Sequence, residues 1–222
     1  MTRDGTLNIV TAGFPYNDIN VIVEILAETA TEHDIPCTGM SLNTRDTFGL
    51  RPSCYHLRLG ASARGAYIPE GEGDILLGLE AGCAARAAAE TIGPHGVGLV
   101  NTWQYHPPHL VQYPTVDALF EKLGRLMAIV VPVDAIRLAE QAGDRRIAQG
   151  LVDMAMLGAL AGSGVLPFTT ADVAHVIGSR YRMTDGERVL NAFHLGVAEI
   201  AATPLALAAP VAVARSVSGS DA

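Results

Sequence analysis

Residues 74–102, DILLGLEAGCAARAAAETIGPHGVGLVNT, decide the fold class of this chain. The stretch holds two short apolar runs, 74–80 and 96–102, and between them lies the Ala-rich segment 81–93. Short unbroken apolar runs are typical of parallel strands that helices cover on both faces, and alanine favours helix. The order of strand, helix and strand therefore predicts a parallel βαβ unit.

The same alternation continues on both sides of this unit. Residues 7–13, LNIVTAG, predict a buried first strand, and Asn17 or Asp18 can cap the helix that follows it. Residues 127–134, MAIVVPVD, predict another strand, and helical patterns fill most of the chain beyond it. The sequence thus predicts an α/β fold with a mainly parallel sheet.

Residues 38–66 interrupt the alternation. They contain a strand-like run, CYHLRLG, at residues 54–60, together with four arginines: Arg45, Arg51, Arg58 and Arg64. We expect an inserted loop and hairpin at about 38–66, at the carboxyl-terminal edge of the sheet. Ligands and partners of open α/β sheets gather at that edge, so the insertion is a candidate contact surface.

The overall composition limits the class of protein. The 222 residues are 49% hydrophobic and 17% charged, as in a globular protein, and we assign 1–208 to one domain and 209–222 to a mobile tail. The net charge of −8 disfavours a nucleic-acid partner, because phosphate contacts need clustered Lys and Arg. We see no apolar run that would span a membrane and no secretory signal, so we expect a cytoplasmic protein.

Three cysteines, Cys37, Cys54 and Cys83, are scattered along the chain. An odd and sparse set argues against a disulfide framework and suits a reducing compartment. Without C-x-x-C spacing, the chain by itself does not supply the ligands of a four-Cys iron–sulfur cluster. Cys54 is close in sequence to His56 and Arg58, which would lower its pKa, although a packed thiol is the simpler interpretation.

The segment TAGFPYND, residues 11–18, stands where a Rossmann fold has its phosphate-binding loop. Such a loop needs glycines, so that backbone N–H groups approach the anion closely, and Gly13 is the one glycine here. Pro15 also lacks an N–H. The segment disfavours a dinucleotide site and leaves three alternatives: a weak anion site, rings that stack on a ligand, or a loop that packs on its neighbours. The candidate ligand-binding residues are Gly13, Tyr16, Asn17, Asp18, Asn101 and Thr102.

Acidic residues alternate along the turn before residues 74–80. Glu70, Glu72 and Asp74 resemble the start of a calcium loop, but Ile75 and Ala81 stand where such a loop has Gly and Glu. Acids beside turn glycines are usually solvated or cap the next element. We therefore interpret the three acids as structural or interfacial.

Aromatic residues and histidines cluster after the second run of the βαβ unit. The pair in HPPH, residues 106–109, has no third zinc ligand nearby in the sequence. Trp103 and the tyrosines around it are more typical of packing or of a partner interface. The candidate interface residues are Arg45, Arg51, Trp103 and Tyr105.

The segment YIPEGEGDILLGLE, residues 67–80, resembles the segment PLIPEGEADVLLGLE of the gamma domain of 2-oxoacid:acceptor oxidoreductases. The resemblance continues in order through 113–123, 131–143, 152–168 and 189–201: YPTVDALFEKL, VPVDAIRLAEQAG, VDMAMLGALAGSGVLPF and VLNAFHLGVAEIA. It covers roughly residues 7–201, and the combination is specific. A separate chain of this length is most similar to the small beta subunit of indolepyruvate:ferredoxin oxidoreductases.

This resemblance implies a Rossmann-like three-layer fold and an accessory subunit of a 2-oxoacid:ferredoxin oxidoreductase. In such complexes a 2-oxoacid and coenzyme A become an acyl-CoA and carbon dioxide, and ferredoxin takes the electrons. It further implies that thiamine diphosphate, magnesium and iron–sulfur clusters belong to a larger partner subunit, with no cofactor in this chain.

Two departures leave alternatives open. The family has a Gly-rich GxGGQG loop where this chain has TAGFPYND, and a compact RGG segment where this chain has the longer insertion. Loss of coenzyme A binding would make the chain a non-catalytic assembly or small-ligand-binding module. A third hypothesis is a self-sufficient enzyme that uses Asp18, His56 or Arg58 in acid–base catalysis.

Overall fold

The computed structural model describes residues 5–14, 16–42, 53–106, 112–143, 148–181 and 186–201. Within them lie six strands: β1 Leu7–Gly13, β2 Cys37–Ser41, β3 Ser53–Leu59, β4 Gly73–Gly78, β5 Ile92–Asn101 and β6 Ile129–Val133. The seven helices are α1 Ile19–Glu32, α2 Ala81–Thr91, α3 Val116–Leu126, α4 Ala135–Ala142, α5 Ala148–Gly162, α6 Thr170–Arg180 and α7 Gly186–Ala201.

The six strands form one sheet in the order β2-β3-β1-β4-β5-β6. The pairs β1–β4, β4–β5 and β5–β6 are parallel, whereas β3 runs antiparallel to both of its neighbours. The predicted α/β class with a mainly parallel sheet is confirmed.

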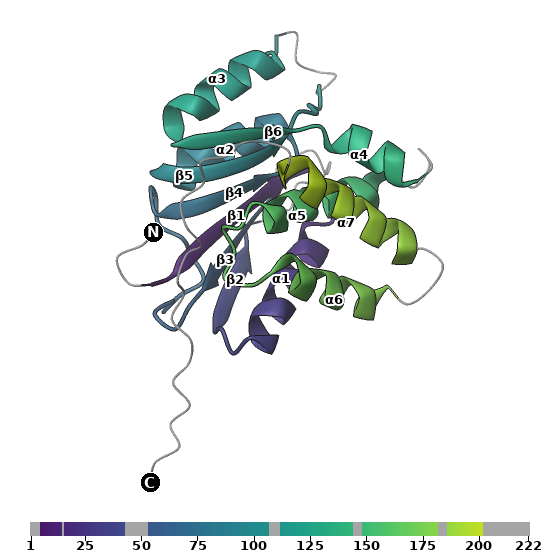
Figure 1. Ribbon diagram of the computed structural model, residues 1–222. Helices are drawn as coiled ribbons and strands as arrows, with labels where there is room; N and C mark the ends of the chain where they lie inside the picture. The colour runs from purple at the N-terminus through teal and green to yellow at the C-terminus, as the bar shows by residue number, and fades with distance from the viewer. Residues whose placement is uncertain are drawn as a thin grey trace.

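Helices cover both faces of this sheet, which gives three layers (Figure 1). Helices α1, α4, α5, α6 and α7 pack on one face, and α2 and α3 pack on the other. Along β4, Ile75 and Leu77 join the first core while Leu76 joins the second. A strand that is buried on both faces has no polar face, and this explains the unbroken apolar runs of the sequence.

The predicted insertion is a hairpin that widens the sheet. Strands β2 and β3 pair antiparallel, and β3 also pairs with β1 along its whole length. Ser53 lies opposite Gly13, so the end of β2 and the start of β3 meet the carboxyl end of β1. The hairpin strands are therefore part of the sheet itself, beside β1. Arg45 and Arg51 lie outside the described residues.

Helix α5 is the buried centre of the larger helical layer. Glycines let α5 and α7 approach backbone to backbone, since a Cβ on Gly162 would stand 2.9 Å from Val197 Cα. A Cβ on Gly158 would collide with the carbonyl oxygen of Phe193. This close packing fixes α5 under the sheet.

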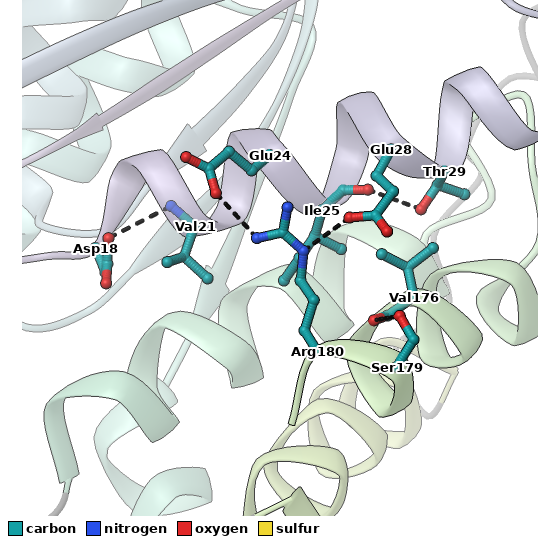
Figure 2. A network of polar contacts seen from close by, with 9 residues as sticks. All are labelled: Asp18, Val21, Glu24, Ile25, Glu28, Thr29, Val176, Ser179 and Arg180. Atoms are coloured by element: carbon teal, nitrogen blue, oxygen red, sulfur yellow. Dashed lines mark hydrogen bonds and ion pairs between the residues drawn. The ribbon is translucent and has the colours of Figure 1, made fainter. Parts of the chain in front are cut away.

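Helix α6 is fastened to α1 by charged side chains. Arg180 donates to Glu28 at 2.8 Å and to Glu24 at 2.9 Å, one helical turn apart on α1 (Figure 2). Thr169 caps α6 in a capping box with Asp172. The ion pairs of Arg180 hold α6 against α1, and the N-terminal end of α1 contacts other residues.

The domain limits predicted at 1–208 and 209–222 stay predictions, since the described part of the chain ends at residue 201. No helix in the described part of the chain has the length and apolar character needed to cross a bilayer.

Candidate functional site

The carboxyl ends of β1, β4 and β5 form the candidate site. After β1 the chain enters α1 on one face of the sheet, and after the neighbouring strand β4 it enters α2 on the other face. Such a switch point is where open α/β sheets bind ligands. The segments that follow these three strands carry most of the residues that the sequence singled out.

The loop after β1 is closed by its own side chain. Asn17 Oδ1 accepts a hydrogen bond from the backbone N–H of Phe14 at 3.0 Å, and Asn17 N donates to Phe14 O at 2.9 Å. A Cβ on Gly13 would stand 2.8 Å from Asn17 Oδ1, so Gly13 makes room for this amide. The glycine thus serves the loop's own packing, which was one of the alternatives that the sequence left open.

A buried carboxylate from α5 occupies the N-terminal end of α1. Asp153 is fully buried; its Oδ2 accepts from Asp18 N at 2.7 Å, and its Oδ1 accepts from Asn17 Nδ2 at 2.8 Å. Rossmann folds hold a ligand phosphate at this end of the helix. In this chain the Asp153 carboxylate accepts hydrogen bonds from N–H donors at that end of the helix.

The sequence analysis did not single out Asp153. The available signal was one carboxylate within the otherwise apolar run LVDMAMLGALAG. Burial raises the pKa of Asp153 to about 6, while its hydrogen bonds to Asp18 and Asn17 act in the opposite direction. At neutral pH the carboxylate is therefore ionised and accepts from both donors.

A second buried carboxylate, Glu80, fixes the segment after β5. Glu80 Oε2 caps α2 by accepting from Cys83 N at 2.6 Å, and its Oε1 accepts from Tyr105 N at 3.0 Å. Asn101 donates to Leu79 O at 3.1 Å and accepts from Trp103 N at 3.3 Å. These bonds position the aromatic residues. Thr102 N donates a hydrogen bond to Val133 O at the end of β6, at 3.0 Å.

Four rings converge above these carboxylates, and we call Phe14, Tyr16, Trp103 and Tyr105 the aromatic surface. Phe14 stacks on Tyr16 with centroids 5.5 Å apart and meets Tyr105 edge-on at 4.9 Å. Trp103 lies 5.8 Å from Tyr16 and 6.4 Å from Tyr105. Phe14 is buried, whereas 41% of Tyr16 is exposed. The fold thus joins a predicted ligand-binding residue to two predicted interface residues.

The acidic turn that precedes β4 has a structural role. Asp74 Oδ2 accepts from Asn8 N at 2.9 Å, and the backbone carbonyl of Glu72 accepts from Asn8 Nδ2 at 2.8 Å. Glu70 and Glu72 are exposed. The turn is therefore anchored to β1, and no group of three potential metal ligands exists among the described residues.

Three residues that the sequence analysis considered for reactivity, acid–base catalysis or zinc binding make structural contacts: Cys54, His56 and His106. Burial raises the pKa of Cys54 to about 12, which is the behaviour of a packed thiol. His56 Nδ1 accepts from Ile68 N at 3.0 Å, and burial followed by the charge of Arg58 lowers the His56 pKa. His106 lies 5.3 Å from the Tyr113 ring, while His109 lies outside the described residues.

Residues 19–199 match the pyruvate ferredoxin/flavodoxin oxidoreductase family. The chain belongs to this family. It is 27% identical over 198 residues to the indolepyruvate oxidoreductase subunit IorB of Archaeoglobus fulgidus, a match that covers 86% of this chain and 93% of the relative. The resemblance seen in the sequence motifs is thus confirmed.

Solved structures share the fold. Pyruvate oxidoreductase subunit PORC of Thermotoga maritima has a TM-score of 0.63 at 20% identity, with 88% of this chain and 97% of that chain covered. The gamma subunit of a keto/oxoacid ferredoxin oxidoreductase of Geobacter sulfurreducens has a TM-score of 0.62 at 16% identity, covering 88% and 99%. A Rossmann-like fold is therefore established.

A longer protein of known structure contains the same fold as one part of its chain. The 2-oxoglutarate:ferredoxin oxidoreductase of Magnetococcus marinus, solved with 2-oxoglutarate, coenzyme A and succinyl-CoA bound, has a TM-score of 0.66 at 16% identity. The match covers 96% of this chain and 33% of that one, so the fold here corresponds to about a third of that polypeptide.

Proposed function

We propose that this chain is the accessory subunit of a thiamine-diphosphate-dependent 2-oxoacid:ferredoxin oxidoreductase. The observation that carries the proposal is the family match over residues 19–199 in a chain that spans 93% of a relative named as one subunit of such an enzyme. Because that relative is named as one subunit, we expect the chain to act together with a partner, and we propose that this partner is larger.

The reaction we propose for the complex is oxidative decarboxylation of an aryl or other 2-oxoacid, with coenzyme A as the acyl acceptor. Identity to an indolepyruvate oxidoreductase subunit favours an aryl side chain. Thiamine diphosphate, magnesium and iron–sulfur clusters belong to the larger cytoplasmic partner in this proposal, and ferredoxin takes the electrons there.

One observation favours a second candidate function, a non-catalytic assembly module that has lost coenzyme A binding. In the loop after β1, the N–H groups of Phe14 and Asp18 are already bonded to Asn17 and Asp153. A phosphate at this place would have to displace the buried carboxylate of Asp153, which would then lose its two charge-assisted hydrogen bonds.

Coexpression with the larger subunit tests both candidates. The purified complex is assayed for reduction of a redox dye with indolepyruvate, phenylpyruvate, pyruvate and 2-oxoglutarate, each with and without coenzyme A. The accessory-subunit proposal expects copurification and dye reduction by one of these acids, above the rate of the larger subunit alone. Copurification with equal rates for the complex and the larger subunit favours the assembly module, and failure to copurify overturns both.

A further inference from the structure

Negative charge gathers beneath the aromatic surface. The carboxylates of Glu80 and Asp153 are both fully buried, one on each side of the switch point. Their effect reaches the exposed ring, because burial first, and then the charges of Glu80 and Asp153 among others, raises the pKa of Tyr16. The carboxylates of Glu80 and Asp153 both disfavour a negative charge on the Tyr16 hydroxyl, so they favour a positive charge beside this ring.

Basic side chains of the neighbouring helices are engaged elsewhere. Arg86 on α2 pairs with Glu90 at 3.1 Å, and Arg180 on α6 pairs with Glu24 and Glu28. In the described ranges no ion pair reaches Glu80 or Asp153, and the bonds they accept come from neutral backbone and amide donors. Within the part of the chain that the structure describes, these two carboxylates therefore have no cationic partner.

Aromatic rings add to this preference. The face of an aromatic ring is the negative end of its quadrupole, so Trp and Tyr attract a cation placed over them and disfavour an anion. Arginine uses such sites best, since its planar guanidinium stacks on a ring while it keeps its charge. Charge and shape therefore complement an arginine side chain.

We propose that the aromatic surface is the docking site for an arginine side chain of the larger partner subunit, which contacts Tyr16, Trp103 and Tyr105. The identity of the partner rests on the proposed function, whereas the preference for a guanidinium rests on the charges and rings of this chain. Tyr16 supplies the exposed face, and Glu80 and Asp153 supply the field beneath it.

The free subunit tests the preference without the partner. Trp103 is the single tryptophan, so its fluorescence reports directly on the site. The chain is titrated with N-acetyl-argininamide and, as a neutral control of nearly the same shape, N-acetyl-citrullinamide, at constant ionic strength. We expect the midpoint for the arginine compound to be about three-fold lower, as for an exposed cation–π contact.

Two variants locate the effect. Tyr16→Leu removes the exposed ring and is expected to abolish the difference between the two compounds, whereas Tyr16→Phe retains it. Equal midpoints in the wild-type subunit would overturn the proposal, as would an unchanged preference in Tyr16→Leu. A complex that oxidises 2-oxoacids while its free subunit shows no preference would refute this inference alone. Loss of copurification while the preference persists would refute the proposed function and the identity of the partner, but not the preference for a guanidinium.

Discussion

At the scale of single residues, the most consequential group is Asp153. Its carboxylate gives up hydration to bind the loop after β1, and two hydrogen bonds offset part of that cost. The loop geometry, and part of the charge beneath the aromatic surface, therefore depend on a side chain 136 residues away from its partner Asn17.

The buried Asp153 predicts a specific dependence of stability on pH. Its folded pKa of about 6 exceeds the ordinary value of 3.8, so the native state binds more protons between these values. The contribution of Asp153 is therefore greatest below pH 4 and falls by about 3 kcal/mol as the pH rises to 6. Urea unfolding from pH 4.5 to 7.5 should show part of this slope in wild-type protein and in the exposed-site control Asp117→Asn, but not in Asp153→Asn. Parallel curves for all three proteins would contradict the assignment.

Cysteine reactivity follows burial. Cys37 is exposed, Cys83 is buried, and the Cys54 pKa of about 12 leaves about one thiolate in 10,000 at pH 8. Brief treatment with iodoacetamide should modify Cys37 alone, as read by mass spectrometry of peptides, and the urea-unfolded chain should react at all three cysteines. Modification of Cys54 in the native protein at the rate of Cys37 would show an activated thiol instead.

At the scale of elements, the contact of α5 with α7 organises the larger helical layer. The two helices touch through backbone at three glycines: Gly158, Gly162 and Gly196. Since α5 also carries Asp153, the helix packing determines where the internal carboxylate meets the end of α1. The packing of α5 against α7 thus contributes to the geometry of the loop after β1.

Alanine at Gly158 should be strongly destabilising. Its Cβ would overlap the Phe193 carbonyl oxygen, and relief requires the two helices to separate, which costs about 3 kcal/mol. The matched control is Gly124→Ala on α3, where no atom lies within 4 Å of the added Cβ and helix propensity favours alanine by up to about 1 kcal/mol. Chemical denaturation of both variants tests the difference, and equal stabilities would show that α5 and α7 adjust freely.

At the scale of the whole molecule, the sheet brings three loops together at one edge. Parallel strands place all their carboxyl ends on the same side, so the segments after β1, β4 and β5 must meet. In this chain the meeting point holds rings and internal carboxylates.

Coenzyme A should bind the isolated subunit weakly or not at all. The backbone N–H groups of Phe14 and Asp18 are already bonded to Asn17 and Asp153, so a diphosphate at this loop has to compete with both side chains. Isothermal calorimetry on the subunit alone measures this directly, and micromolar affinity would refute it. The assembled complex is the comparison.

Removal of the Trp103 ring should damage assembly more than folding. Trp103 is half-buried, and Trp residues at interfaces often contribute 2 kcal/mol or more to binding. We expect Trp103→Ala to stay folded by circular dichroism while copurification with the larger subunit and 2-oxoacid oxidation fail together. If the variant unfolds the free subunit yet still assembles at low temperature, the ring belongs to the core of this chain.

The sequence by itself determined the layers, the sheet and the family. Apolar runs such as 74–80 have no polar face, so they require cover on both sides, and the Gly-poor loop at 11–18 already argued against a dinucleotide site. The hairpin near 38–66 was also foreseen as an interruption of the alternation. These features are local, because periodicity and loop composition are written within a few neighbouring residues.

Only the tertiary structure decided how the site is built. It showed that Asp153 fills the end of α1, that Glu80 and Asn101 support the aromatic segment, and that Tyr16 meets Trp103. Each of these contacts joins residues from different elements, and nothing in either segment alone specifies its partner. The physical reason is that burial and hydrogen bonding depend on what the fold brings into contact, and that is settled by packing across the sheet.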